Sequence, residues 1–240
     1  MNSTRGKKPS NRKHSKRHIS GNRQFRDRAE VTRRLATVST STLSDVMDSL
    51  GIPAVLAGIR AVTSTAKIVG PAVTVKEVSG TLGAYHQSDF GVGEIIDEAG
   101  RGDILVIDND GQRISTWGLL ASFSSQVKGV AGVVVNGGIR DVQQISEINF
   151  PVFARYVVPL SGKRRIKIES INKPIIIENV KIEPKDIVVG DDTGIVVIPA
   201  KVSNQVLEQA KSLERLEQEY MPLLKSGVPL SELVKKHSHL

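Results

Sequence analysis

The sequence has no cysteine among its 240 residues. This absence excludes disulfide bonds, zinc–thiolate sites and thiol nucleophiles. Aromatic residues make up only 4% of the chain, so the hydrophobic core has to be built mainly from Val, Ile, Leu and Ala. No apolar run approaches the roughly 18 residues that a membrane span requires, and the basic N-terminus lacks the apolar segment of a secretory signal. We therefore expect a cytoplasmic protein without membrane contacts.

Positive charge is concentrated at the N-terminus. The net charge is +8, and residues 1–28 alone carry +9, because they contain ten Lys and Arg residues but one acid, Asp27. This segment has almost no apolar residues, so we expect a disordered basic tail over 1–28, followed by a single folded domain over 29–240. Phe25 is the one aromatic residue among its cations, which argues against base stacking. We expect at most weak, non-specific contact with nucleic acid.

The apolar pattern predicts an α/β fold with a mixed sheet. Predicted strands cover 67–69, 72–75, 104–108, 133–135 and 151–154, and predicted helices cover 42–50, 91–99, 118–128 and 142–148. Such alternation is typical of a parallel βαβ core. Beyond Pro159, alternating segments at 166–169, 175–177 and 180–182 and a hairpin over 186–199 predict antiparallel strands. A charged helix over 201–225 and a short helix after Pro229 complete the prediction.

Several local signals predict boundaries and turns. Thr42 is a candidate helix cap, with Asp45 three residues later as in a capping box. Gly70-Pro71 is expected to separate two strands. The run Asp191-Asp192-Thr193-Gly194 is more typical of a hairpin turn than of a metal site. His86 lies in a Gly- and Ser-rich stretch and is more typical of a surface or structural residue than of a ligand.

The most informative motif follows the predicted strand at Val133–Val135. The chain continues as Asn136-Gly137-Gly138-Ile139-Arg140-Asp141. We interpret the two glycines as a sharp turn. That turn would bring Arg140 and Asp141 to the sheet edge at which α/β proteins bind ligands. Arg140 has the planar fork that grips a carboxylate, and Asp141 offers the oxygen ligand that Mg²⁺ prefers.

Two other segments are expected to meet this pair. Asp108 ends the strand at 104–107, and Trp117-Gly118 precedes a helix whose free N–H groups favour anions. If the two strands are parallel neighbours, all three parts converge at one end of the sheet. The pattern suggests a small dicarboxylate or keto acid bound with a metal. The structural alternative for Arg140-Asp141 is a salt-bridged helix start.

A series of motifs, in order along the chain, resembles the RraA-like family. The motifs are Thr42–Asp45, Gly70–Val75, Gly102–Asp108, Trp117–Ala121, Gly129–Asp141, Pro151–Arg155 and Gly190–Gly194, and the resemblance covers roughly residues 35–230. It implies a swivelling β/β/α domain with a mixed sheet, helices and a C-terminal helix. It also implies a homotrimer, or a hexamer, with sites between subunits.

This family includes 4-hydroxy-4-methyl-2-oxoglutarate aldolases, which also decarboxylate oxaloacetate, and RraA, a regulator of ribonuclease E. The resemblance implies a class II lyase that acts on 2-keto acids, with Arg140 and Asp141 as catalytic residues and Asp141 as the ligand of Mg²⁺ or Mn²⁺. It implies that the substrate is bound by Arg140 and by the backbone of Gly118, Leu119, Leu120 and Ala121.

One position departs from the family pattern. Aldolase-type members usually have Glu or Asp directly after the glycine of the helix-start motif, where this chain has Leu119. A leucine cannot accept a hydrogen bond from metal-bound water. A carboxylate from elsewhere could replace it, either Asp108 or an acid of a neighbour's C-terminal helix such as Glu214 or Glu217. The alternative function is a non-catalytic regulatory protein, or a binding protein associated with RNA or RNA processing.

Overall fold

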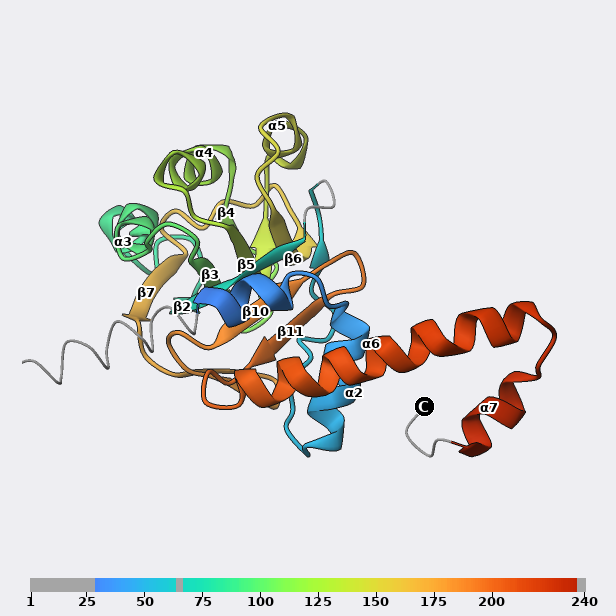
Figure 1. Cartoon of the computed structure of the whole chain (residues 1–240). Coiled ribbons are helices and arrows are strands. Elements are labelled where there is room, and N and C mark those ends of the chain that lie inside the picture. The colour runs from blue at the N-terminus through green and yellow to red at the C-terminus, as the bar shows by residue number, and fades with distance from the viewer. Residues whose placement is uncertain (1–28, 64–66, 237–240) are drawn as a thin grey trace, which may run out of the picture.

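The computed structural model describes residues 29–63 and 67–236, and the predicted basic tail at 1–28 lies outside them (Figure 1). After a helix at 29–35, the helical elements are α2 Thr40–Ser49, the short 3-10 helix η1 Gln87–Asp89, α3 Val92–Asp97, α4 Leu119–Lys128, α5 Val142–Glu147, α6 Ser203–Lys225 and α7 Leu230–Lys236. The strands are β1 Arg60–Ala61, β2 Ile68–Ser79, β3 Ile104–Asp108, β4 Ser115–Trp117, β5 Gly132–Ile139, β6 Val152–Val157, β7 Ile166–Ile171, β8 Ile175–Ile177, β9 Val180–Ile182, β10 Ile187–Gly190 and β11 Ile195–Ile198.

The strands form a mixed sheet, as the sequence predicts. Its main path runs β1-β6-β5-β3-β2-β10-β11, with β4 paired to β5 and β7 paired to β2. The central strands β6, β5, β3 and β2 are parallel, whereas β1, β7 and β10 join them antiparallel. Strands β8 and β9 pair separately. The carboxyl ends of the parallel strands therefore meet at one edge.

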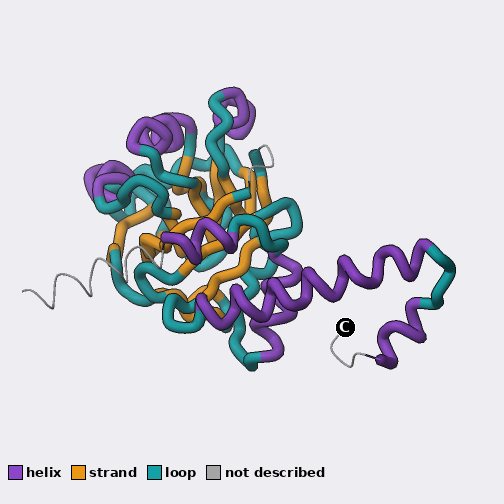
Figure 2. The backbone as a smooth tube through the Cα atoms, viewed as in Figure 1, coloured by secondary structure: helices purple, strands orange, loops and turns teal. Residues whose placement is uncertain are grey.

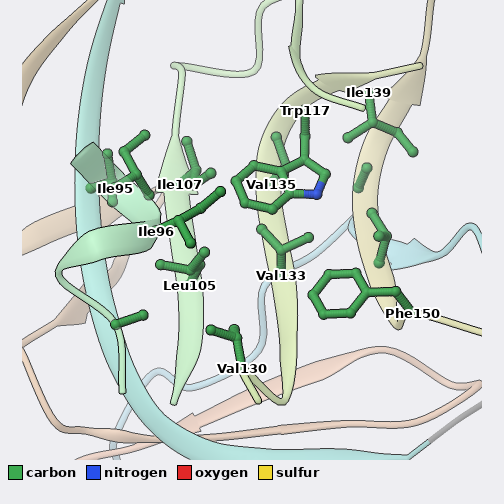
Figure 3. Close-up of a cluster of buried hydrophobic side chains, with 14 of the residues drawn as sticks. Ile95, Ile96, Leu105, Ile107, Trp117, Val130, Val133, Val135, Ile139 and Phe150 are labelled. Atoms are coloured by element: carbon green, nitrogen blue, oxygen red, sulfur yellow. The ribbon is translucent and has the colours of Figure 1, made fainter. Parts of the chain in front are cut away.

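Buried aliphatic side chains hold the layers together. Helices α3, α4 and α5 lie side by side over one face of the sheet (Figures 1 and 2). Between them and the strands is the cluster of Figure 3, which contains Ile95, Ile96, Leu105, Ile107, Trp117, Val130, Val133, Val135, Ile139 and Phe150. Each such side chain contributes about 1.5–3 kcal/mol when it is fully buried. On the other side, α2 and α6 pack on β10 and β11 through a second aliphatic cluster.

Helix α2 begins earlier than the sequence suggests. Its cap is Ser39, whose hydroxyl accepts a hydrogen bond from the Thr42 amide over 3.0 Å, so the prediction of Thr42 as the cap is wrong. The start of the helix is set by a contact with a residue far away in the sequence. The Asp191 carboxylate accepts hydrogen bonds from the Thr40 amide (2.9 Å) and hydroxyl (2.6 Å), which fixes the first helical residue. Asp191 also accepts from the Thr193 amide in its own hairpin, which agrees with the turn interpretation.

Two predicted chain breaks are wrong. Strand β2 runs through Gly70-Pro71 without interruption, and β5 runs through Gly137-Gly138. At Gly138 the backbone is extended, and an added Cβ would lie 2.6 Å from Val158 Cγ2. The absence of a side chain therefore allows close packing and not a turn. The turn comes at Asp141, which has a φ of 60°.

The C-terminal helices form an arm. As predicted, α6 is a long helix, and its distal half extends away from the sheet while α7 turns back beside it (Figures 1 and 2). The Tyr220 hydroxyl of α6 donates to the Leu233 carbonyl of α7 over 3.3 Å. Across residues 29–63 and 67–236, every helix is too short or too polar to cross a bilayer.

Candidate functional site

Strands β4 and β5 bring the two predicted halves of the site together. The short strand β4 is absent from the sequence prediction, and it pairs with β5 through Ser115–Gly138 and Trp117–Ile139. The Arg140 amide then donates to the Trp117 carbonyl over 3.0 Å. Gly118, which follows Trp117, consequently lies against Arg140 at the carboxyl ends of both strands.

Asp141 joins the two segments. Its Oδ2 atom accepts a hydrogen bond from the Leu119 amide at the start of α4 over 3.1 Å, and it lies 3.7 Å from Nε of Arg140. Gly118 gives α4 no side-chain cap, so the carboxylate from the neighbouring loop satisfies the first amide. The salt-bridged helix start is thus real, but it uses only one oxygen. The amides of Leu120 and Ala121 in the same turn have no intrahelical acceptor.

Gly118 permits the close approach of these side chains. An added Cβ would lie 2.6 Å from Oδ2 of Asp141 and 3.3 Å from Cγ of Arg140. The φ of Gly118 is −161°, an extended conformation that any residue adopts. Space, and not backbone conformation, therefore requires glycine here.

A cavity of about 380 Å³ opens at this point. It is lined by Gly118, Leu119, Leu120, Ala121, Arg140 and Asp141, all of which the sequence indicated, together with Phe90, Val92, Ser115, Thr116, Trp117, Gln144, Ser161 and Lys163. Lys163 was not foreseen, because no motif marks it. The Gly162 amide donates to the Ser115 carbonyl over 2.9 Å, which brings the loop after β6, and with it Lys163, to the rim of the cavity.

Asp108 does not belong to this cavity, so the expected convergence of three parts is wrong for that residue. Its side chain is 1% exposed and binds Lys76 Nζ (2.8 Å) and Asn136 Nδ2 (2.8 Å). Successive residues of a strand point to opposite faces. Ile107 packs in the cluster beneath α3 and α4, so Asp108 faces the other way. Its carboxylate cannot replace the acid that the family pattern has at Leu119.

His86 also lies apart from the cavity. Its side chain is exposed, and Nδ1 is 2.9 Å from the Ser88 hydroxyl. The surface interpretation of this residue agrees with the structure.

A metal at this site would rest on Asp141. The described parts of the chain contain no group of three or more His, Asp or Glu side chains with metal-binding geometry. Oδ1 of Asp141 accepts no hydrogen bond from the residues described here, and the side chain is 38% exposed. One carboxylate with waters and substrate oxygens is an ordinary Mg²⁺ environment. Leu119 packs against the core cluster and adds no oxygen from its side chain. The residues present therefore fit a metal that is weakly held by the protein alone.

A buried carboxyl group lies behind the cavity wall. Glu77 is fully buried, and its Oε1 accepts a hydrogen bond from the Thr116 hydroxyl over 2.5 Å. Burial raises the pKa of Glu77 to about 8, and the nearby negative charge of Asp108 acts in the same direction. The hydrogen bond from Thr116 lowers the pKa but does not compensate. Sequence inspection gave no sign of this group, because Glu77 lies near the polar end of strand β2, beside Lys76 and close to Ser79.

Comparison with known proteins finds a matching family profile and similar sequences. The family profile described as Aldolase/RraA, RraA-like, matches residues 40–197. Over 178 residues the chain is 34% identical to a Halalkalibacterium halodurans protein named "Putative 4-hydroxy-4-methyl-2-oxoglutarate aldolase", covering 73% of this chain and 79% of that protein. It is 32% identical over 207 residues to protein DlpA of Legionella pneumophila, covering 84% of this chain but 33% of DlpA. The chain thus spans about one third of DlpA.

The solved structure of Streptomyces coelicolor RraAS2 is also similar. It is described as an unusual member of the RNase ES inhibitor RraA protein family. The TM-score is 0.73 at 27% identity, with 80% of this chain and 96% of that chain covered.

The fold and the cavity define a mixed α/β protein that presents a cationic and an anionic side chain together at the ends of parallel strands. The family profile covers well over half of the chain. The chain belongs to the RraA-like family.

Proposed function

We propose that this protein is a divalent-metal-dependent lyase that acts on 2-keto acids, by retro-aldol cleavage of substrates like 4-hydroxy-4-methyl-2-oxoglutarate or by decarboxylation of oxaloacetate. The observation that carries the proposal is the placement of Arg140 and Asp141 beside the first turn of α4 in one cavity. Relatives that are named as aldolases of this substrate support it.

Each group of the cavity has a role suited to such a substrate. The guanidinium of Arg140 would grip the carboxylate next to the keto group, while the amides of Leu120 and Ala121 receive its negative charge. Lys163 would bind the distal carboxylate of a dianionic substrate. Oδ1 of Asp141 would hold Mg²⁺ or Mn²⁺, whose chemistry in such a site is to polarise the keto oxygen as a Lewis acid. Arg140 would also stabilise the negative charge of the pyruvate enolate that cleavage of the C–C bond leaves.

The proposal includes a homo-oligomer, a trimer or a hexamer, as the family resemblance implies. Helix α4 supports this because its outer face is apolar: Leu120, Phe123 and Val127 are 84%, 54% and 72% exposed. Large apolar side chains at such spacing on a helix surface mark an interaction face. A neighbouring copy on this face could bring Glu214 or Glu217 of its α6 toward Asp141 and so supply the carboxylate that Leu119 lacks.

Pyruvate release from oxaloacetate tests this function. With Mg²⁺ present, we expect the protein to exceed the rate of Mg²⁺ alone. Arg140→Ala should lower kcat/KM by 10²-fold or more, because a charge-assisted carboxylate contact is lost. Arg33→Ala, which removes an exposed Arg paired with Glu30, is the matched control and should leave the rate unchanged. Activity at the metal-only background, or unaltered by Arg140→Ala, would contradict the proposal.

The alternative is a non-catalytic protein of RNA processing. Leu119 and the +9 segment at 1–28 favour it, as does the similarity to RraAS2. A tail that neutralises several phosphates would bind RNA with steep salt dependence. Removal of residues 1–28 should then abolish RNA binding at low salt, while oxaloacetate turnover stays absent in both forms.

A further inference from the structure

The second oxygen of Glu77 is the least explained polar atom near the cavity. Glu77 is 0% exposed, and Oε2 has no hydrogen-bond partner among the residues that the structure describes. Oε1 is 2.5 Å from the hydroxyl of Thr116. A buried carboxylate without a cation or a second donor is costly. The neutral acid, which carries a proton, is the form that this environment favours.

The charged groups near Glu77 do not stabilise its ionised form. The charged group that acts on Glu77 is Asp108 of β3, which is also acidic. Lys76 precedes Glu77 in β2, but its Nζ binds Asp108 and Asp110 on the opposite face of the sheet. On its own side, Glu77 is opposite Ile168 of β7. The hydroxyl of Thr116 is thus the one hydrogen-bond partner of the Glu77 side chain among the residues that the structure describes.

Thr116 connects this acid to the cavity. It is the central residue of β4, and it lines the same cavity as Arg140 and Asp141. A hydroxyl group both donates and accepts, and its hydrogen rotates to suit. When Glu77 is protonated, Thr116 can therefore accept from Oε1 and direct its own hydrogen into the cavity.

The proposed reaction requires a proton at this place. Cleavage of the C–C bond leaves the enolate of pyruvate, and its terminal carbon must gain a proton to become the methyl group. An arginine guanidinium does not act as an acid in proteins, and a carboxylate that binds a metal carries no proton to give. Among the side chains that line the cavity, this leaves the hydroxyl groups and the ammonium group of Lys163 as donors.

We propose that Thr116 delivers this proton and that Glu77 replaces it. The enolate carbon takes the hydrogen of the Thr116 hydroxyl, so a C–H bond forms and the enolate charge is discharged. The Glu77 carboxylic acid passes its proton to the threonine oxygen and becomes a carboxylate. A proton from solvent water restores the acid before the next turnover. Thr116 touches the reacting carbon, while Glu77 acts through it. This inference rests on the proposed lyase function.

Exchange of the pyruvate methyl protons in D₂O tests the relay, because the same donor and carbon are used in reverse. The loss of the methyl signal is followed by ¹H NMR with pyruvate, Mg²⁺ and protein, and oxaloacetate decarboxylation is measured in parallel. Glu77→Gln and Thr116→Val should each slow exchange by about 10²-fold, a typical loss for a general acid. Thr116→Ser should restore it. Decarboxylation should fall much less, because the enol can leave and take its proton in solution.

Two controls separate the relay from a structural role. Thr74 lies elsewhere on β2, and its hydroxyl donates to the Lys173 carbonyl. Thr74→Val removes this hydroxyl and should leave the rate of methyl proton exchange at the wild-type value. The affinity for oxalate, an analogue of the enolate, should be unchanged in Glu77→Gln and Thr116→Val.

The relay is contradicted if exchange survives in Thr116→Val, or if Glu77→Gln exchanges at the wild-type rate. It is also contradicted if exchange, decarboxylation and oxalate affinity all fall together, since that pattern reports a displaced β4. Failure of the lyase proposal is a different result: the wild-type protein would then show neither decarboxylation nor exchange.

Discussion

Oδ2 of Asp141 lies 3.1 Å from the backbone nitrogen of Leu119, so the loop after β5 caps the helix after β4. The residue that departs from the family pattern is thus joined to the candidate metal ligand through its backbone. The side chain of Leu119 packs on the core. The contact fixes the carboxylate of Asp141 whatever side chain residue 119 carries.

This contact predicts a stability effect that is independent of catalysis. Asp141→Ala should lower the free energy of unfolding by about 0.5–2 kcal/mol, the range for loss of a helix cap. Asp141→Asn keeps an acceptor oxygen and should recover most of that loss. Urea denaturation of both variants measures the effect. Equal stability of Asp141→Ala and the wild type would show that the cap contributes nothing.

The space at Gly118 predicts a strong effect of a single methyl group. Gly118→Ala places a carbon 2.6 Å from the carboxylate oxygen of Asp141, so the side chain has to move. Misplacement of this order costs about 10²-fold in rate, and we expect that loss in kcat/KM for oxaloacetate. Gly93→Ala is the control, because an added Cβ there meets no atom within 4 Å. Full activity of Gly118→Ala would contradict the geometry of the site.

A carboxylate at position 119 should strengthen the metal site. Leu119→Glu adds the carboxylate that the family pattern has there, which can accept a hydrogen bond from metal-bound water. We expect the Mg²⁺ concentration for half-maximal activity to fall by about tenfold, within the range seen for outer-sphere partners. Ser124→Glu adds the same charge to an exposed position of α4 outside the cavity. If both variants shift the Mg²⁺ dependence equally, general electrostatics and not coordination explains the change.

Glu77 predicts a stability that depends on pH. The folded-state pKa of about 8 lies above the ordinary value of 4.5, so the folded protein holds the proton more tightly than the unfolded chain. The contribution of Glu77 to the free energy of unfolding should therefore be largest below pH 4.5. It should fall as the pH rises to about 8, by up to about 1.4 kcal/mol per pH unit. Glu77→Gln should remove this slope. Thermal unfolding between pH 5 and 9 measures it, and parallel curves for the two proteins would show that Glu77 is not neutral when folded.

Asp191 predicts a pH effect of the opposite sign. Burial alone would raise its pKa, but the hydrogen bonds from Thr40 and Thr193 outweigh burial and hold the pKa below its usual value. Its contribution is then present above the unfolded-state pKa and is lost as pH falls through the folded-state pKa. Asp191→Ala should cost about 1.5–3 kcal/mol at pH 7, as for charged hydrogen bonds. Asp192→Ala, at the exposed neighbouring position, should cost less than about 0.5 kcal/mol.

The parallel core was predictable because its strands are buried on both faces. Strands β3 and β5 are buried throughout, which produces the apolar runs Ile104–Ile107 and Val133–Val135 in the sequence. Strand β4 escaped prediction because Ser115-Thr116-Trp117 is too short for a period to emerge. The start of α2 escaped because its cap is reinforced by Asp191, which is 151 residues away from Thr40.

The candidate site was predictable where its residues are consecutive. Arg140, Asp141 and the start of α4 were found from a motif, and the structure places them together. Asp108 was misplaced because a sequence does not show which sheet face a strand-end residue occupies. Lys163 and Glu77 were missed because hydrogen bonds between distant segments bring Lys163 to the cavity and join Glu77 to Thr116 of its wall.

The most direct test of the central claim is the rate of pyruvate release from oxaloacetate as Mg²⁺ is titrated. The wild-type protein should show saturable, metal-dependent turnover that a chelator abolishes. Asp141→Ala should remain at the metal-only background at every Mg²⁺ concentration while it keeps a folded circular dichroism spectrum. Turnover by Asp141→Ala that saturates like the wild type, or no turnover by the wild type, would contradict the assignment of Asp141 as the metal ligand of a lyase.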